Sequence, residues 1–360
     1  MKRIMPFILL FQILSCATPD NKDFSIPISK SKAYVEHFMD STKVPGMSLA
    51  VLHKGQIIWS EGFGFANIEQ LVRVNTKSKF RIASVSKPIT GVLTAYLYQN
   101  GILDIDIPVH NVLNDFPKKK WDFNIRQLMC HAAGIRHYLD KDTNYTDYHS
   151  NIKSGLEIIK NDSLLYKPGS RCSYSSYGYN IIGAFIEKST GKLLGDILAD
   201  SLFVPLEMDN TTIDHPFKLI ANRTSAYTLN ENNEQVNARF YDNRYKIPAG
   251  GILSTAEDLV QFGYKILHSN YLNKKSINLL FTPYKYADEE SSDTGFGWIT
   301  TADDQGNKLY GHLGGTTGGC SAIMIYPEKE LIVVWLGNLD ADWSDIPTKT
   351  IANYFLETLD

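Results

Sequence analysis

The sequence predicts an α/β (α+β) fold: a mainly antiparallel sheet built from both termini, flanked by helices and carrying a large all-helical insertion. Three observations support this. Strand-like segments around a hairpin turn lie near the N-terminus, helical periodicity dominates the middle, and strand-like segments return near the C-terminus. Because the strands lie at both ends, we expect the two ends to pair into one sheet with the insertion beside it.

Composition is typical of one large globular unit or two closely packed lobes. The chain has 360 residues, 43% of them hydrophobic and 21% charged, and a formal net charge of −3. This is ample apolar mass for a core. The longest basic run is Lys118-Lys119-Lys120, and arginine and aromatic residues are not interleaved. Nucleic acid is therefore not an expected partner.

The first residues predict export. Two basic residues precede an apolar run over 4–14, which is too short to span a bilayer but suits a secretory signal. Ile13-Leu14-Ser15-Cys16 resembles a bacterial lipobox. We therefore expect a signal peptide over 1–16, lipid attachment at Cys16 and a tether over 17–30. The protein would then be anchored in the bacterial cell envelope, on the periplasmic or outer-membrane face; an ordinary signal peptide with an incidental cysteine is the alternative.

Residues 31–360 are predicted to form a single catalytic domain. Its α/β lobe would take about 31–83 and 290–360, and its helical lobe about 84–289. Ser254 is expected to cap a helix, with Glu257 completing a capping box. The predicted strands are 47–53, 56–66, 296–300, 308–311, 321–326 and 331–336, and the predicted helices are 31–39, 84–101, 125–131, 156–160, 179–191, 193–202, 255–267 and 346–356.

Ser84 is the candidate nucleophile. Pro88 is best tolerated in the first turn of a helix, which puts Ser84 at or near the helix start. Residues three apart share a helix face, so the Lys87 ammonium can approach the Ser84 hydroxyl, and the helix dipole favours an alkoxide there. Apolar neighbours and a core-facing helix distinguish Ser84 from the other serines with this spacing, for which a solvated surface pair is the simpler interpretation: Ser29, Ser150 and Ser189.

Tyr174, in Tyr174-Ser175-Ser176, is the candidate partner of Lys87. A phenol with a reference pKa of roughly 10 is a poor base at neutral pH, but a nearby lysine cation would stabilise the phenolate and lower that pKa. Tyr174 and Lys87 would together take the proton from Ser84. On the local sequence alone, two similar stretches remain alternatives: Tyr98-Gln99-Asn100 and Tyr241-Asp242-Asn243.

A glycine-rich stretch supplies the third candidate segment. Five glycines lie within residues 311–319, so the backbone can approach a ligand closely. If this edge faces Ser84, an N–H group near Gly315 could join that of Ser84 in an oxyanion hole, where the loss of one donor costs roughly 2.7–4 kcal/mol of barrier. His312 would point into the same space; a histidine in a glycine-rich hairpin turn is the alternative interpretation.

Neither a metal nor a cofactor is expected. Apart from Cys16 the chain has three cysteines, with no Cys-x-x-Cys pair, so a disulfide framework is not expected either. His-Glu-x-x-His is absent, and His131 and His137 lack a third ligand at helical spacing.

The three segments, in this order, resemble the motifs of class C serine β-lactamases, penicillin-binding DD-peptidases and their esterase relatives. They are Ser84-Val85-Ser86-Lys87, Tyr174-Ser175-Ser176 and His312-Leu313-Gly314. The likeness covers nearly all of the mature chain and is greatest to the mitochondrial serine β-lactamase-like branch. Stretches that carry it are 103–109, 134–138, and Tyr245-Lys246 before Ala249-Gly250-Gly251.

This resemblance implies a β-lactamase/transpeptidase-like catalytic domain and a role for each motif. Ser84 would form the acyl-enzyme, Lys87 and Tyr174 would handle its proton, and the resemblance places Tyr241 in a flanking stretch. The Ser84 and Gly315 amides would hold the oxyanion. His312 would complete the catalytic set, and the implied substrate-binding residues are Ser176, Gly314 and Thr316.

Two departures from the family pattern bear on the substrate. Ser176 replaces an asparagine common in β-lactamases and is shorter, and His312 replaces a lysine and is largely neutral near pH 7 at a reference pKa of roughly 6.5. We therefore expect hydrolysis of a small peptide or ester in preference to efficient turnover of a β-lactam. The alternative is an anchored binding or scaffold protein that keeps the fold. A Ser-His-Asp hydrolase is disfavoured because no Gly-x-Ser-x-Gly occurs.

Overall fold

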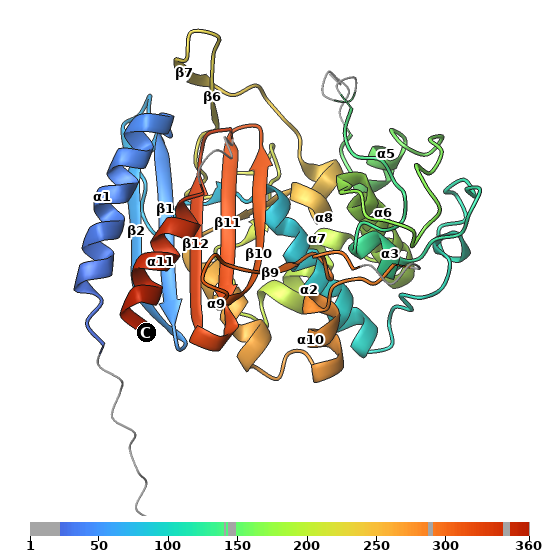
Figure 1. Ribbon diagram of the computed structural model, residues 1–360. Helices are drawn as coiled ribbons and strands as arrows, with labels where there is room; N and C mark the ends of the chain where they lie inside the picture. Colours follow the sequence, from blue (N-terminus) through green and yellow to red (C-terminus); the bar gives the residue numbers. More distant parts are fainter. Residues whose placement is uncertain (1–21, 140–141, 143–148, 287–290, 341–345, 360) are drawn as a thin grey trace, which may run out of the picture.

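The main sheet has seven strands in the order β3-β2-β1-β12-β11-β10-β9, and every neighbouring pair is antiparallel (Figure 1). The computed structural model describes residues 22–139, 142, 149–286, 291–340 and 346–359. The strands are β1 (Gly46–His53), β2 (Gln56–Asn67), β3 (Val72–Arg73), β9 (Ile299–Ala302), β10 (Lys308–Thr316), β11 (Gly319–Tyr326) and β12 (Leu331–Gly337). The predicted sheet from both ends of the chain is confirmed.

The two ends of the chain meet where β1 pairs with β12. Leu49 lies opposite Trp335, and the pairing extends from Met47 to His53. Every residue of β1 is buried, because helices cover both faces of the sheet at this strand. The central pairing therefore joins segments from opposite ends of the chain and fixes the α/β lobe.

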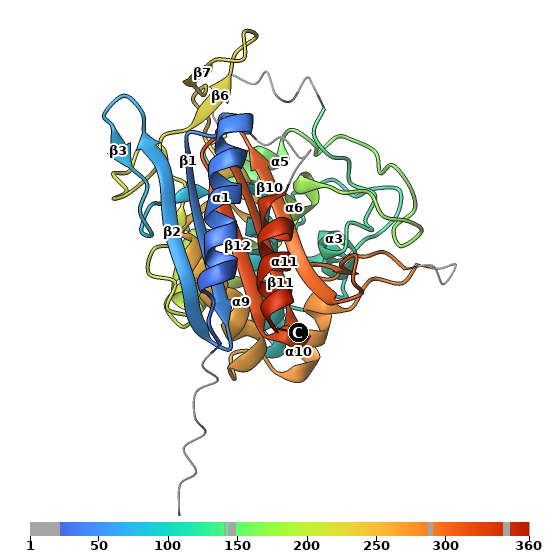
Figure 2. The ribbon, with the colours of Figure 1, turned by 60° about the vertical axis from the view of Figure 1, so that its left-hand side comes forward.

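Helices α1 (Ser25–Thr42) and α11 (Pro347–Leu359) lie side by side on one face of the sheet (Figure 2). Val35 and Phe355 from these helices belong to the same apolar cluster as Leu49. On the other face α9 (Ala256–His268) packs on β1 and β12. Although α9 was predicted in the helical lobe, the structure places it against the sheet.

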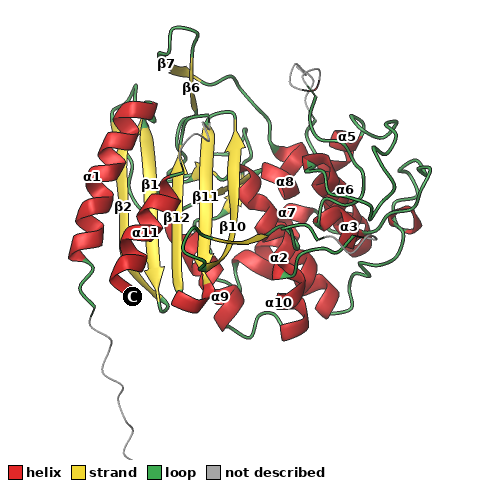
Figure 3. Ribbon diagram, in the orientation of Figure 1, coloured by secondary structure: helices red, strands yellow, loops and turns green. Residues whose placement is uncertain are grey.

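The helical lobe fills the space beside β10 (Figure 3). Its α-helices are α2 (Ser86–Gln99), α3 (Ile125–Met129), α5 (Ile152–Leu156), α6 (Ser176–Thr190), α7 (Leu194–Leu198), α8 (Ile247–Gly250) and α10 (Lys274–Phe281). Shorter helical segments are η1 (Ala83–Val85), η2 (Val109–Asn111), η3 (Ala199–Phe203), η4 (Arg244–Lys246) and, in the α/β lobe, η5 (Pro327–Lys329).

The insertion is not entirely helical, which corrects the prediction. A three-stranded sheet in the order β4-β8-β5 and the hairpin β6-β7 lie within or at the border of it. Their bounds are β4 (Phe80–Arg81), β5 (Thr212–Ile213), β6 (Tyr227–Leu229), β7 (Gln235–Asn237) and β8 (Ile252–Ser254). Because β8 pairs with β4 just before Ser84, the small sheet holds the chain that leads into the nucleophile.

The predicted helix cap, Ser254, and its predicted capping-box partner, Glu257, were both wrong. Ser254 ends β8 opposite Phe80, so the cap of α9 is Thr255, whose hydroxyl accepts a hydrogen bond from the Asp258 N–H at 3.2 Å. Glu257 instead accepts a hydrogen bond from the Ser60 hydroxyl at 2.8 Å. Ser254 could either pair in a strand or cap the helix, and in the structure it pairs with Phe80 in the small sheet.

The predicted lipid attachment site, Cys16, lies outside the described residues. Helix α1 begins at Ser25, so residues 25–30 of the predicted tether belong to the folded domain. Within the described ranges, none of the helices has both the length and the apolar character needed to cross a bilayer.

Candidate active site

Ser84 lies in the short helix η1, which precedes α2, and it is partly exposed. Ala83 before it has φ +45°, a left-handed conformation that costs about 1–3 kcal/mol for a residue other than glycine. Two long-range contacts hold this turn: the Ile82 N–H donates to the Ile252 carbonyl at 3.1 Å, and the Ser321 hydroxyl donates to the Ile82 carbonyl at 2.7 Å. Pro88 lies in the first turn of α2, as predicted.

Lys87 is fully buried and directed at Ser84. Its Nζ atom lies 3.0 Å from Ser84 Oγ, 3.1 Å from Ser176 Oγ and 2.9 Å from the Ala249 carbonyl oxygen. All three partners are uncharged. Burial, with no carboxylate to compensate for it, lowers the pKa of Lys87 well below its usual value. The lowered pKa favours the neutral amine, which is the form able to accept a proton.

Tyr174 joins the same group, but its electrostatics differ from the prediction. Its ring centre lies 4.8 Å from Lys87 Nζ, and its phenol forms hydrogen bonds with Ser84 and Ser176. Desolvation raises the pKa of Tyr174 to about 12. The expected lowering of the Tyr174 pKa was wrong, because desolvation of the phenol outweighs its hydrogen bonds to Ser84 and Ser176. Tyr174 stays protonated, and Lys87 is the better base.

Two histidines that sequence analysis had considered only as metal ligands hold the Tyr174 segment. His131 Nδ1 accepts a hydrogen bond from the Ser175 N–H at 3.1 Å, and His137 Nδ1 accepts one from the Ser176 N–H at 3.2 Å. Their rings lie 4.5 Å and 5.2 Å from the Tyr174 ring. Burial lowers the pKa of both, that of His137 to about 4, so each is neutral and fixed as an acceptor.

His312 lies in β10, which continues through Thr316, so the alternative of a turn histidine was wrong. Its ring is 6.2 Å from that of Tyr174, and its Nδ1–H donates to the Leu313 carbonyl at 2.6 Å. Burial lowers the pKa of His312 to about 3. His312 is thus in the site and neutral, which agrees with the expected lack of a permanent cation there.

Gly314 brings β10 directly against the nucleophile. A Cβ atom at this position would lie 2.3 Å from the Ile82 carbonyl oxygen and 3.0 Å from the Ser84 nitrogen. Such distances exclude a side chain, so only glycine fits here. Gly315 follows Gly314 on the same strand, and its role in the oxyanion hole stays a prediction.

Lys246 is a further residue of the site that sequence analysis had used only as part of the resemblance. It ends η4, is 6% exposed and places Nζ 3.3 Å from Thr316 Oγ1. Burial is the largest cause that lowers the pKa of Lys246, to about 7. The proximity of Tyr245-Lys246 to a glycine turn was visible in the sequence, but its contact with β10 was not.

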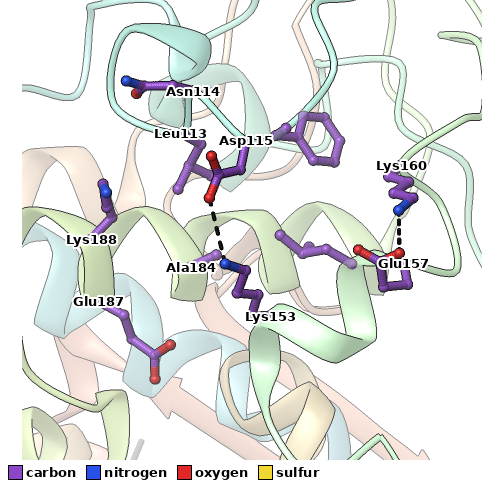
Figure 4. Close-up of a pocket in the computed structure, with 11 residues that line it drawn as sticks. Leu113, Asn114, Asp115, Lys153, Glu157, Lys160, Ala184, Glu187 and Lys188 are labelled. Carbon is purple, nitrogen blue, oxygen red and sulfur yellow. Dashed lines mark hydrogen bonds and ion pairs between the residues drawn. The ribbon is translucent and has the colours of Figure 1, made fainter.

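A separate cavity of about 310 Å³ lies in the helical lobe and holds none of the predicted site residues (Figure 4). Ion pairs between Lys153 and Asp115 and between Lys160 and Glu157 line it. It contains no serine or cysteine. Within the described ranges, no group of three histidine, cysteine or acidic residues is placed to hold a metal ion.

Two known proteins are similar to this chain over most of its length. The serine beta-lactamase-like protein LACTB, mitochondrial, of Homo sapiens is 26% identical over 408 residues, covering 87% of this chain and 74% of that protein. Penicillin-binding protein 4* of Bacillus subtilis (strain 168) is 26% identical, covering 80% of this chain and 67% of that protein.

A solved structure shows the same architecture. The octameric penicillin-binding protein homologue from Pyrococcus abyssi superposes with a TM-score of 0.79 and 25% identity, over 92% of this chain and 77% of that chain. The sequence model of the family described as Beta-lactamase matches residues 32–352. The chain therefore belongs to the beta-lactamase family of serine hydrolases, as its three motifs had suggested.

Proposed function

We propose that this protein hydrolyses a small peptide or ester through an acyl-enzyme on Ser84. The observation that carries the proposal is the buried Lys87 amine, 3.0 Å from Ser84 Oγ and surrounded by neutral partners. A neutral amine at that distance is a general base ready to accept the serine proton. The intact pair, together with Tyr174, argues against a scaffold that has lost turnover.

In the first half-reaction, Ser84 Oγ bonds to the substrate carbonyl carbon while its proton passes to Lys87 Nζ. The new ammonium keeps hydrogen bonds to Ser176 Oγ and the Ala249 carbonyl. As the bond to the leaving group breaks, Lys87 gives its proton to the leaving group by way of the Tyr174 phenol. Water then attacks the acyl-enzyme ester and gives one proton to Lys87. Lys87 returns this proton to Ser84 Oγ as the carboxylic acid product leaves.

The Ser84 and Gly315 N–H groups would stabilise the oxyanion in both half-reactions. Each such donor is worth about 2.7–4 kcal/mol of barrier. The close approach of Gly314 to Ser84 supports this arrangement, because it brings the backbone of β10 beside that of the nucleophile. Ser176, Gly314 and Thr316 would contact the substrate.

Covalent labelling tests the proposal. Purified protein is treated with a fluorophosphonate and, separately, with a fluorescent penicillin, and the adduct is mapped by mass spectrometry. We expect fluorophosphonate labelling at Ser84 that is abolished in Ser84→Ala. Ser86→Ala is the matched control, because Ser86 is buried two residues away and its hydroxyl has no hydrogen-bond partner among the described residues. Labelling at another serine, or none, rejects the proposal.

We also propose export with lipid attachment at Cys16, on the strength of the apolar run and the lipobox-like sequence before it. Metabolic labelling with a fatty acid analogue in a bacterial host is the test. The label should enter the full-length protein and be absent from Cys16→Ser. Equal incorporation into both rejects the anchor.

A further inference from the structure

Lys246 is a buried ammonium group with too few acceptors. In the part of the chain that the structure describes, the hydrogen-bond acceptor found for its Nζ atom is Thr316 Oγ1 at 3.3 Å, and no carboxylate lies within ion-pair distance of it. A lysine carries three N–H donors. A side chain that is only 6% exposed therefore keeps donors that the protein does not satisfy.

Three aromatic rings surround the Lys246 amine. The rings of Tyr138, Tyr241 and Tyr245 lie 5.9, 4.6 and 6.0 Å from its Nζ atom. Aromatic faces attract a cation, and more strongly where water is excluded. The neighbouring acid is already engaged: Asp214 accepts hydrogen bonds from Arg81 Nε at 2.9 Å and from Asn243 at 2.7 Å.

Lys246 also lies close to the reacting centre. Its partner Thr316 is two residues beyond Gly314, whose backbone contacts Ser84. At a rise of about 3.3 Å per strand residue, this is about 7 Å along β10. A substrate bound at Ser84 would therefore reach Lys246 with a group four or five bonds from its scissile carbonyl.

We infer that Lys246 and Thr316 form a subsite for a carboxylate of the substrate, an inference that rests on the proposed function. The ammonium comes from η4, whereas the third motif on β10 carries only the neutral His312. Lys246 supplies the charge and Thr316 a hydroxyl donor. Hydrogen bonds to a charged group are the stronger ones in proteins, so a free carboxylate is preferred to an amide.

The pKa of Lys246 is consistent with such a subsite. Burial lowers it to about 7 in the free protein, so the ammonium is costly until an anion arrives. A bound carboxylate stabilises the charged form and raises the pKa again. Arg81 is not an alternative ligand, because its guanidinium is held by Asp214 and by the Thr317 carbonyl at 2.8 Å.

Matched substrates test the inference. One pair carries the test group on the acyl side, 4-nitrophenyl hydrogen glutarate and its ω-amide. The other carries it on the leaving group, the phenylacetyl esters of 3-hydroxybenzoic acid and 3-hydroxybenzamide. At pH 6.5 we expect kcat/KM for the acid to exceed that for the amide by about 10- to 100-fold in at least one pair, the effect of a hydrogen bond to a charged group. No preference in either pair overturns the subsite.

Variants assign the preference to Lys246. Lys246→Met should reduce the acid-to-amide ratio to near one, Lys246→Arg should keep most of it, and Thr316→Val should lower it several-fold. Lys79→Met is the matched control, because Lys79 is 9% exposed and bonded to a neutral amide, Asn210. An unchanged ratio in Lys246→Met overturns the inference. If Lys246→Met does not fold, the acid-to-amide ratio of Thr316→Val is the test, and an unchanged ratio there overturns the inference.

Fluorophosphonate labelling separates this failure from that of the proposed function. The probe is uncharged and carries no carboxylate, so Lys246→Met should still be labelled at Ser84. Labelling without any acid preference removes the subsite and leaves the acyl-enzyme intact. Absence of labelling in the unmodified protein removes both.

Discussion

The Nζ atom of Lys87 lies 3.0 Å from the Oγ atom of Ser84, in a buried place that lowers the pKa of the amine well below its usual value. Burial of a lysine without a carboxylate is costly, and the cost is met here by three neutral acceptors. The same burial that destabilises the ammonium lowers the pKa of Lys87 and so favours the amine form that can act as a base. Burial of Lys87 therefore both costs stability and prepares the amine to accept a proton.

Lys87→Met tests that connection. Loss of the general base should slow acylation of Ser84 by about 10²- to 10⁴-fold. The melting temperature should change much less, because methionine fills similar space and removes a buried amine, although it leaves three acceptors without a donor. The rate of fluorophosphonate labelling and a thermal melt measure the two effects. Near-normal labelling would contradict the role given to Lys87.

Tyr174→Phe distinguishes a relay from a base. Because the pKa of Tyr174 is about 12, the phenol is protonated at pH 7 and its loss removes a hydrogen-bonding relay. We expect acylation to fall about 100-fold, at the low end for a group that transfers protons. The acidic limb of the pH–rate profile, set by Lys87, should not move. Tyr98→Phe is the control, and an equal loss there would return Tyr98 to consideration.

Acid stability should depend on the buried histidines around Tyr174. The pKa of His137 is about 4 and that of His312 about 3, well below the usual value of roughly 6.5. Between pH 6.5 and 4 the unfolded chain therefore binds more protons than the folded one, and the free energy of unfolding falls as the pH falls.

Urea unfolding at pH 7 and pH 5 measures this effect. His137→Gln can still accept a hydrogen bond from the Ser176 N–H, and it should lose less stability between the two pH values than the unmodified protein. His37→Gln, on the exposed side of α1, is the control. An identical pH dependence in all three proteins would exclude His137 as a source of acid sensitivity.

The sequence predicts well those features that depend on residues close together in the chain, such as turns and helices. Lys54 and Gly55 both adopt positive φ, 48° and 79°, in the tight turn between β1 and β2 that the sequence had indicated. The apolar stripe of α2 and the position of Pro88 likewise follow from helical spacing. Ser84 and Lys87, three residues apart, belong to this class.

The rest depends on contacts between distant segments. His131 meets the Ser175 N–H across 44 residues, and Lys246 meets Thr316 across 70. The prediction for Tyr174 failed in its electrostatics for the same reason, because the burial of Lys87 is a property of the packed lobe. Charge states follow from tertiary packing, so the sequence alone could not predict the raised pKa of Tyr174.

The carboxylate preference should vanish as the pH rises through about 7 to 8. Burial and the charges of Arg81, Lys87 and Arg239 lower the pKa of Lys246 to about 7 in the free protein, and Asp214 opposes them. Since kcat/KM reports groups of the free enzyme, loss of the Lys246 proton should lower kcat/KM for the acid but not for the amide. Lys246→Arg stays charged and should keep the preference at pH 9. A pH-independent ratio in the unmodified protein would contradict this assignment.

Gly314→Ala should disable the site by displacing β10 from the nucleophile. Its Cβ would lie 2.3 Å from both the Ile82 carbonyl oxygen and Ser321 Oγ, so the strand or the turn that holds Ser84 must shift. Overpacking of this kind costs about 1–3 kcal/mol of stability. A shift of about 1 Å at the reacting atoms can cost about 100-fold in rate.

Gly178→Ala, in the first turn of α6, is the matched control. There the nearest heavy atom to a new Cβ is 3.5 Å away, an ordinary contact, and alanine favours the helix. Labelling rates and melting temperatures of the two variants should therefore diverge: Gly314→Ala loses both, whereas Gly178→Ala keeps the rate and holds or gains stability. Full activity in Gly314→Ala would show that β10 does not need to lie this close to Ser84.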